Sequence, residues 1–162
     1  MDTALDPQLV SLLQTFDTGM LATTDDGGHL HARPMALGRC DASGKLYFLT
    51  TIDGGSAEEI ERDPHVEIIF QGTKKFVSLT GMARLSVDRS HIEELWSPFL
   101  RVWFPEGKHD PSLCIVEVEA ESAEYWDNRG LRGLAFLFET AKAFVAGLRG
   151  PSREGHAHGR AG

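Results

Sequence analysis

The feature that most constrains the fold is a series of short strand-like segments separated by tight turns. Gly19–Thr24 and His29–Leu37 flank the turn Asp25–Gly28, and a second turn at Asp41–Gly44 leads into Lys45–Thr51. Asp-Gly and Gly-Gly pairs adopt positive φ at little cost, which suits the tight turns of hairpins. Two consecutive hairpins predict a mainly antiparallel sheet.

Three further segments continue the pattern. His65–Gln71, Phe76–Val87 and Leu113–Tyr125 are strand-like, and Gly81 predicts a bulge or bend within the second of them. Long helices do not alternate with these strands, so a layered parallel sheet is disfavoured. The sequence therefore predicts a mainly β protein, a six-stranded antiparallel barrel with a few short peripheral helices.

Helices are expected at four places. Asp6 can cap the first, and Pro7 fits its first helical position. Short helices follow near 57–62 and 88–96. Apolar residues recur at helical spacing over 131–148, which predicts a longer C-terminal helix.

The length of 162 residues suits one domain, which we place at residues 1–150. Residues 151–162 lack an apolar pattern and are predicted to form a disordered tail. A signal peptide would begin with basic residues, but Met1–Val10 contains none. No stretch approaches the roughly 18 apolar residues of a membrane span. We therefore expect a cytoplasmic protein that does not bind membranes.

The charge balance bears on the partners of the chain. Lys and Arg number 16 against 24 Asp and Glu, which gives a formal net charge of −8. This balance disfavours a general nucleic-acid binder, which needs cations to replace the counterions of phosphates. A few local cations can still hold one small anionic ligand.

Cysteines and histidines give little sign of a metal site. Cys40 and Cys114 form no C-x-x-C pair and are interpreted as buried small hydrophobic residues. His29 and His31 lie two apart on one strand face, a spacing that could suit a metal, but no third ligand is near in sequence. We expect no metal.

Arg33-Pro34-Met35 is the first motif with chemical potential. Proline in a strand cannot donate a ladder hydrogen bond, so Pro34 is expected at an edge or an interruption. Such an edge presents backbone groups to a planar ligand, and Arg33 adds donors suited to a phosphate or ribityl chain. The alternative is an exposed arginine beside a strand-breaking proline. The motif alone leaves both interpretations open.

Thr50–Ala57 is the second motif, a strand end followed by a Gly-Gly loop and a helix start. Free amides at a helix N-terminus and in a glycine-rich loop attract anions, so a phosphate could bind here. The alternative is a plain turn with Ser56 as the helix cap. The following Glu58, Glu59 and Glu61 are interpreted as a solvated helix face.

Two aromatic features complete the candidates. Prolines stiffen the loop Trp103–Pro111, which holds aromatic side chains and a lysine in a fixed orientation. Trp126, at the end of the last strand, could cover one side of a flat aromatic ligand. The alternatives are a loop that packs on the end of the barrel and a tryptophan that anchors a core or interface.

Taken in order, these segments resemble the pyridoxamine 5′-phosphate oxidase-like flavin-binding split barrels, and within them the bacterial general stress proteins. The resemblance spans about Gly19 to Asp127. The matching motifs are A-R-P-M at 32–35, F-L-T-T at 48–51, E-E-I-E-R-D-P-H-V at 58–66, V-S-L-T-G-M-A at 77–83, W-F-P-E-G-K-H-D-P at 103–111 and E-Y-W-D at 124–127.

The resemblance implies a homodimer that holds two flavin mononucleotides (FMN) at its interface. The residues that it implies at the cofactor are Arg33, Pro34, Met35, Leu49, Thr50, Thr51, Gly55, Ser56, Ala57, Gln71, Trp103, Phe104, Lys108, Asp110 and Trp126. Those between 103 and 110 would reach the flavin from the partner subunit.

The implied roles differ along the chain. Arg33–Met35 would line the ribityl and ring region, Leu49–Thr51 would contact the flavin, and Gly55–Ala57 would lie at the phosphate. Gln71 would approach the ring, and Trp126 would flank it. No side chain is assigned as a catalytic acid or base, because any redox chemistry would belong to the isoalloxazine ring.

Departures from the family pattern leave the activity open. Ser56 stands where many relatives carry a phosphate-binding lysine, and the C-terminal Arg and His of the true oxidases have no match here. Our first hypothesis is an FMN-binding general stress protein, an oxidoreductase of unknown substrate if it is an enzyme. The alternatives are a pyridoxamine 5′-phosphate oxidase and a non-enzymatic interaction protein with an empty barrel.

Overall fold

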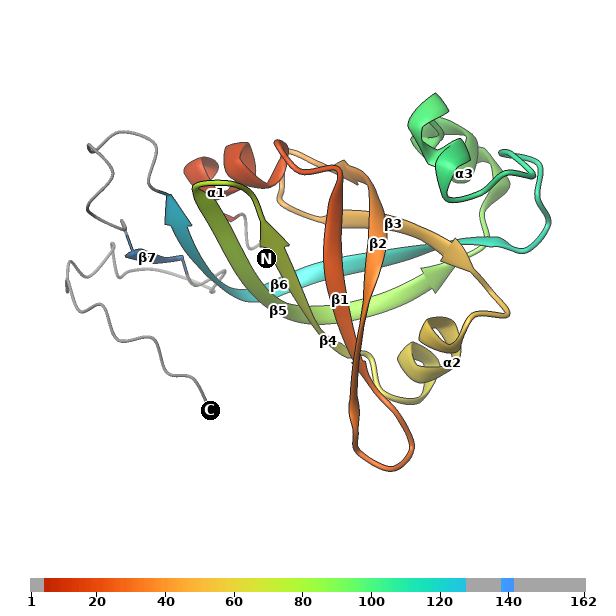
Figure 1. Ribbon diagram of the computed structural model, residues 1–162, viewed down its shortest axis with the longest axis horizontal. Coiled ribbons are helices and arrows are strands. Elements are labelled where there is room, and N and C mark those ends of the chain that lie inside the picture. Colours follow the sequence, from red (N-terminus) through yellow and green to blue (C-terminus); the bar gives the residue numbers. More distant parts are fainter. Residues whose placement is uncertain (1–4, 128–137, 142–162) are drawn as a thin grey trace.

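The computed structural model describes residues 5–127 and 138–141. Six antiparallel strands of the described sheet follow the order β3-β2-β1-β4-β5-β6, and pairing of β6 with β3 closes these six into a barrel (Figure 1). Their bounds are β1 Thr18–Thr24, β2 Leu30–Cys40, β3 Leu46–Thr51, β4 His65–Gln71, β5 Lys75–Ser86 and β6 Leu113–Asp127. The predicted mainly β, six-stranded antiparallel barrel is confirmed.

Short helices pack around the barrel. They are α1 Pro7–Leu13, α2 Gly55–Arg62, α3 Arg89–Leu95 and the 3-10 helix η1 Pro98–Val102. The predicted start of α1 is confirmed, since the Asp6 carboxylate accepts a hydrogen bond from the Gln8 amide at 2.7 Å. Among the described residues, no helix is long and apolar enough to cross a membrane.

Two apolar clusters stabilise this arrangement. The larger cluster fills the barrel and includes Phe48 and Phe70, which are fully buried. Leucines of α1 and Ile60 of α2 extend the larger cluster, and Figure 1 shows these two helices at different ends of the barrel. The smaller cluster lies between the sheet and the α3–η1 segment and includes Leu49 and Ile92. Burial of apolar area in both clusters is the main driving force for this fold.

The barrel is split along one side of β2. This strand pairs with β1 from Leu30 to Ala36, but its pairing with β3 begins only at Ala36. Pro34 therefore lies where β2 has one strand neighbour, which confirms the predicted edge position. Figure 1 shows the β1–β2 hairpin extending beyond the rest of the sheet on the side where α2 lies.

Gly81 lies at the predicted irregularity in β5. The register between β5 and β6 shifts between Thr80 and Gly81, which is the mark of a bulge. A Cβ atom at position 81 would lie 2.3 Å from the backbone oxygen of Glu119. Only glycine allows the two strands to approach this closely.

The prediction of a C-terminal helix over 131–148 is wrong at residues 138–141, the part of this range that the structure describes. Phe138–Ala141 form a short strand, β7, which pairs antiparallel with residues 123–126 of β6. β6 continues beyond its pairing with β3, so its second half offers a free edge for another strand. The other residues of that predicted helix, and the predicted tail 151–162, lie outside the described residues.

Candidate functional site

Arg33 lies on the split half of β2 and is tied to helix α2. Its Nη1 atom donates to Glu59 Oε2 at 2.9 Å and to Thr23 Oγ1 at 3.0 Å. The Thr23 hydroxyl also donates to Glu59 Oε2. Glu59 is only 8% exposed, so the prediction that it belongs to a solvated face is wrong, whereas Glu58 and Glu61 are exposed as predicted.

The burial of Glu59 follows from the periodicity of α2. The buried side of this helix carries Ser56, Ala57, Glu59 and Ile60. Position 59 is three residues after Ser56 and next to Ile60, so a helical projection would have placed it on the packed side. The hydrogen bond from Arg33, followed by that from Thr23, holds the pKa of Glu59 below its ordinary range despite burial.

His31 lies between two carboxylates near this cluster. Its Nδ1 atom is 3.2 Å from Glu59 Oε1, and its Nε2 atom is 3.3 Å from Asp25 Oδ2. His29 also contacts the Asp25 carboxylate, at 3.2 Å. Within residues 5–127 and 138–141, no group of three or more His, Cys, Asp or Glu side chains is arranged to hold a metal ion.

The loop between β3 and α2 forms the candidate anion site. Thr50 Oγ1 lies 3.4 Å from Ser56 Oγ, and the Gly54 amide donates to Thr51 O at 3.1 Å. Gly54 is the N-cap of α2, so the alternative in which Ser56 caps the helix is wrong. Space at Gly55 is open, since a Cβ atom there would have no neighbour within 4 Å. The first turn of a helix leaves amides without intrahelical partners, and these can bind an anion.

The predicted residues of β2 and β3 differ in how far they are exposed around this loop. Met35 is buried in the barrel and Leu49 in the cluster next to α3, so a ligand could reach only the backbone of either residue. Pro34 is exposed and faces outward. Thr50 and Thr51 are half-buried. The structure therefore brings the predicted residues of β2, β3 and α2 to one end of the barrel.

Gln71 and Trp126 lie at the other end. Gln71 pairs with Phe76 on β5, and Phe76 pairs with Trp126 on β6, so the two residues occupy one row of the sheet. Gln71 is the last residue of β4, whereas α2 lies next to the first residue of that strand, His65. Within one chain, these two residues are separated from the β3–α2 loop by the length of β4.

The loop at 103–111 packs on its own chain. Trp103 and Phe104 contact the cluster next to α3, as the packing alternative predicts. The Asp110 carboxylate accepts hydrogen bonds from the amide and hydroxyl of Ser112, at 2.9 and 2.7 Å. Lys108 is exposed. The only functional group of Asp110 is thus used within its own turn.

This loop also adjoins the β3–α2 loop. The Ile52 amide donates to Ser112 O at 2.7 Å. Arg89 of α3 donates to the backbone oxygens of Asp110, Pro111 and Leu113, at 2.8, 3.2 and 3.1 Å. The Ile52–Ser112 hydrogen bond thus holds the end of this loop against the β3–α2 loop, and the Arg89 hydrogen bonds tie it to α3.

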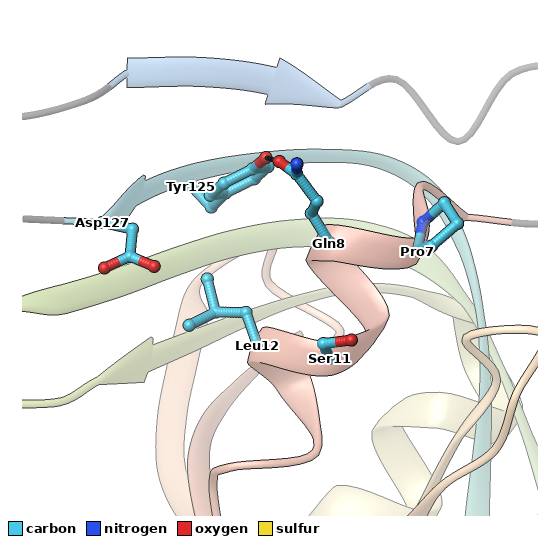
Figure 2. A pocket seen from close by; sticks show the side chains of 6 residues that line it. All are labelled: Pro7, Gln8, Ser11, Leu12, Tyr125 and Asp127. Carbon is cyan, nitrogen blue, oxygen red and sulfur yellow. Dashed lines mark hydrogen bonds between the residues drawn. The ribbon is translucent and has the colours of Figure 1, made fainter. Parts of the chain in front are cut away.

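A pocket lies elsewhere, between α1 and the end of β6 (Figure 2). Its lining residues are Pro7, Gln8, Ser11, Leu12, Tyr125 and Asp127. The Tyr125 hydroxyl donates to Gln8 Oε1 at 3.3 Å across this pocket. None of the residues implied at the cofactor lines it, so the pocket is separate from the candidate site.

The outer face of the barrel carries an apolar row. Met20 on β1 lies opposite Pro34 on β2 and Ile69 on β4, and all three side chains are exposed. Met20 is 39% and Ile69 44% exposed. Exposed apolar residues that lie side by side indicate an interaction surface more strongly than scattered ones do.

A closed antiparallel barrel of six strands, with a glycine loop and helix start beside the unpaired edge of β2, defines a class of small split-barrel proteins. The family model described as pyridoxamine 5′-phosphate oxidase like matches residues 6–150. The chain belongs to the pyridoxamine 5′-phosphate oxidase-like family.

Within this family, the chain is similar to general stress protein 26 of Bacillus subtilis, with 31% identity over 119 residues that span 70% of this chain and 82% of that protein. It is 28% identical to protein bli-3 of Neurospora crassa over 72% of this chain, and the match spans 62% of the length of bli-3. The general stress FMN/FAD binding protein of Xanthomonas citri is a similar solved structure, with a TM-score of 0.63 and 25% identity over 88% of this chain and 94% of that one.

Proposed function

We propose that this protein binds FMN at the β3–α2 loop, in a site that two copies of the chain form together. The observation that carries the proposal is the open helix start at Gly55, flanked by the hydroxyls of Thr50 and Ser56 and by the split edge of β2. The similar protein of Xanthomonas citri is an FMN/FAD binding protein, which supports a flavin as the ligand.

The parts of the site suit different parts of FMN. Amides in the first turn of α2 and the two hydroxyls suit the phosphate, because they donate hydrogen bonds without needing a free cation. Around Pro34, β2 pairs with β1 but not with β3, so its backbone groups on that side can form hydrogen bonds with the polar edge of the flat ring. Gly55 lets the phosphate approach the backbone, since no side chain stands in the way.

A second copy of the chain completes the site. In one chain, Gln71 and Trp126 lie far from the β3–α2 loop, and the apolar row of Met20, Pro34 and Ile69 is exposed. Pairing of two copies through this row would bury it and would bring the 103–110 loop, with Trp103 and Lys108, to the flavin of the partner.

The proposed activity is that of a general stress protein with a flavin cofactor. Bound FMN would supply electron or hydride transfer through its isoalloxazine ring. The described residues of this chain would bind and orient the ring and would exclude water from one of its sides. Redox activity, with a substrate that is still to be identified, is the function that we propose for the assembled dimer.

The absorption spectrum of freshly purified protein tests this function. We expect the two absorption bands of oxidised flavin to copurify with the protein, and added FMN to lose its fluorescence on binding. A colourless protein that leaves the fluorescence of FMN unchanged would refute the proposal. Formation of pyridoxal phosphate from pyridoxamine phosphate under air would instead assign the oxidase activity.

A further inference from the structure

We infer that Arg33 serves the proposed flavin site as a positioning residue, through Glu59 and helix α2, rather than as the cation that neutralises the phosphate. This inference rests on the proposed function. Arg33 Nη1 donates to Glu59 Oε2 at 2.9 Å, and Glu59 is nearly buried. The positive charge of Arg33 is therefore already paired with a carboxylate of the same chain.

The Glu59 carboxylate is fully engaged in the described structure. Its Oε2 atom accepts from Arg33 and from Thr23, and its Oε1 atom lies 3.2 Å from His31 Nδ1. All three partners belong to the β1–β2 hairpin, whereas Glu59 belongs to α2. The cluster thus joins the hairpin to the helix with a set of directional hydrogen bonds.

The contacts of Glu59 with Arg33, Thr23 and His31 form a joint between the hairpin and α2. This joint fixes the part of α2 that would bind the phosphate. Ser56 precedes Glu59 by three residues, so the two lie on one side of the helix, less than one turn apart. Figure 1 shows α2 beside the β1–β2 hairpin, in agreement with this joint. A shift of Glu59 would move the amides of Gly55 and Ser56 relative to Thr50, which lies on β3.

The two roles of Arg33 predict different responses to neutral variants. Arg33→Gln alone leaves the buried Glu59 carboxylate without its cation, so α2 would lose its anchor on the hairpin. Changing both residues to glutamine removes the charges together and keeps groups that can donate and accept across the joint. If Arg33 positions α2, the added Glu59→Gln change should restore the FMN affinity that Arg33→Gln loses. If Arg33 contacts the phosphate directly, the added change cannot restore that affinity.

The experiment measures the dissociation constants of FMN and riboflavin, which lacks the phosphate, for wild type, R33Q and R33Q/E59Q. We expect R33Q to weaken FMN binding by about tenfold or more, and R33Q/E59Q to recover most of that loss. A double variant that binds FMN no more tightly than R33Q, with riboflavin unaffected in both, would show a direct contact and overturn the inference. Unchanged FMN affinity in R33Q would overturn it as well.

E59Q alone provides a second measurement that does not require removal of Arg33. If Arg33 touches the phosphate, release from Glu59 should raise the preference for FMN over riboflavin. If Arg33 positions α2, the preference should not rise. The matched control is R62Q/E58Q, which removes an exposed ion pair of the same helix, 3.1 Å apart, and should leave both affinities unchanged.

The failure of this inference differs from a failure of the proposed function. If wild type binds neither FMN nor riboflavin, the flavin function is wrong and the role of Arg33 falls with it. If wild type binds FMN and the double variant shows no recovery, the flavin function stands and only the positioning role is wrong.

Discussion

Glu59 keeps its negative charge in a nearly buried position because donors surround it. Arg33, Thr23 and His31 all face its carboxylate, and the hydrogen bond from Arg33 contributes most to its lowered pKa. A carboxyl whose pKa is lower in the folded state stabilises the fold above its unfolded pKa, and this contribution is lost as pH falls through the folded pKa.

Glu59→Gln should therefore change how the free energy of unfolding depends on pH in the acidic range. Charge-assisted hydrogen bonds contribute about 1.5–3 kcal/mol each, so we expect E59Q to be less stable than wild type at neutral pH by roughly this amount. The difference should shrink as pH falls below the ordinary range of glutamate. Urea unfolding across this pH range is the measurement, and two parallel curves would contradict the assignment.

The two cysteines should be unreactive in the folded protein. Burial raises the pKa of Cys40 to about 12 and that of Cys114 to about 11, so hardly any reactive thiolate forms near neutral pH. A thiol-specific chromogenic reagent should modify neither residue in native buffer and both in denaturant. Rapid modification of either thiol in native buffer would show that its surroundings open.

Local turn chemistry made most elements predictable. Asp-Gly turns, the Asp6-Pro7 helix start and the Gly81 bulge each act within a few residues, so the six barrel strands and the helices α1, α2 and α3 were predicted nearly at their observed bounds. The 3-10 helix η1 was not predicted. Phe138–Ala141 shows the limit of that reasoning. Its apolar spacing predicted a helix, but a free edge of β6, set by tertiary structure, pairs with it as a strand.

Gly81→Ala tests the close approach at the bulge. The added methyl group would collide with the backbone oxygen of Glu119, and backbone atoms cannot rotate away. We expect a loss of about 1–3 kcal/mol in the free energy of unfolding, as overpacked sites show. Gly55→Ala, where the methyl group meets open space, is the control for unfolding stability. Equal stability of the two variants would argue against a tight bulge.

At the scale of the whole molecule, the candidate site was only partly predictable. The β3–α2 loop follows from Gly54, Gly55 and the helix pattern after them, so the sequence suffices to find it. Glu59 was missed because a run of acidic residues suggests solvent, and its partners on the hairpin are 26 and 36 residues away. Contacts between two copies of the chain leave no local pattern, because they depend on surfaces that form after folding.

Met20→Glu tests the proposed pairing face. The new charge would lie within the apolar row next to Ile69 and Pro34, and it would be buried without a partner in a dimer. Sedimentation equilibrium should show wild type as a dimer and M20E shifted to monomer. Val87→Glu, at an exposed apolar residue outside the row, should remain dimeric. A dimeric M20E would place the interface elsewhere.

The most direct test of a shared flavin site is the composition of the native assembly. Native mass spectrometry of the purified protein with added FMN gives the number of chains and of flavins in each particle. The account predicts two chains with two FMN molecules, and no flavin on monomers at low concentration. Monomers that keep FMN, or dimers that never take it up, would contradict it.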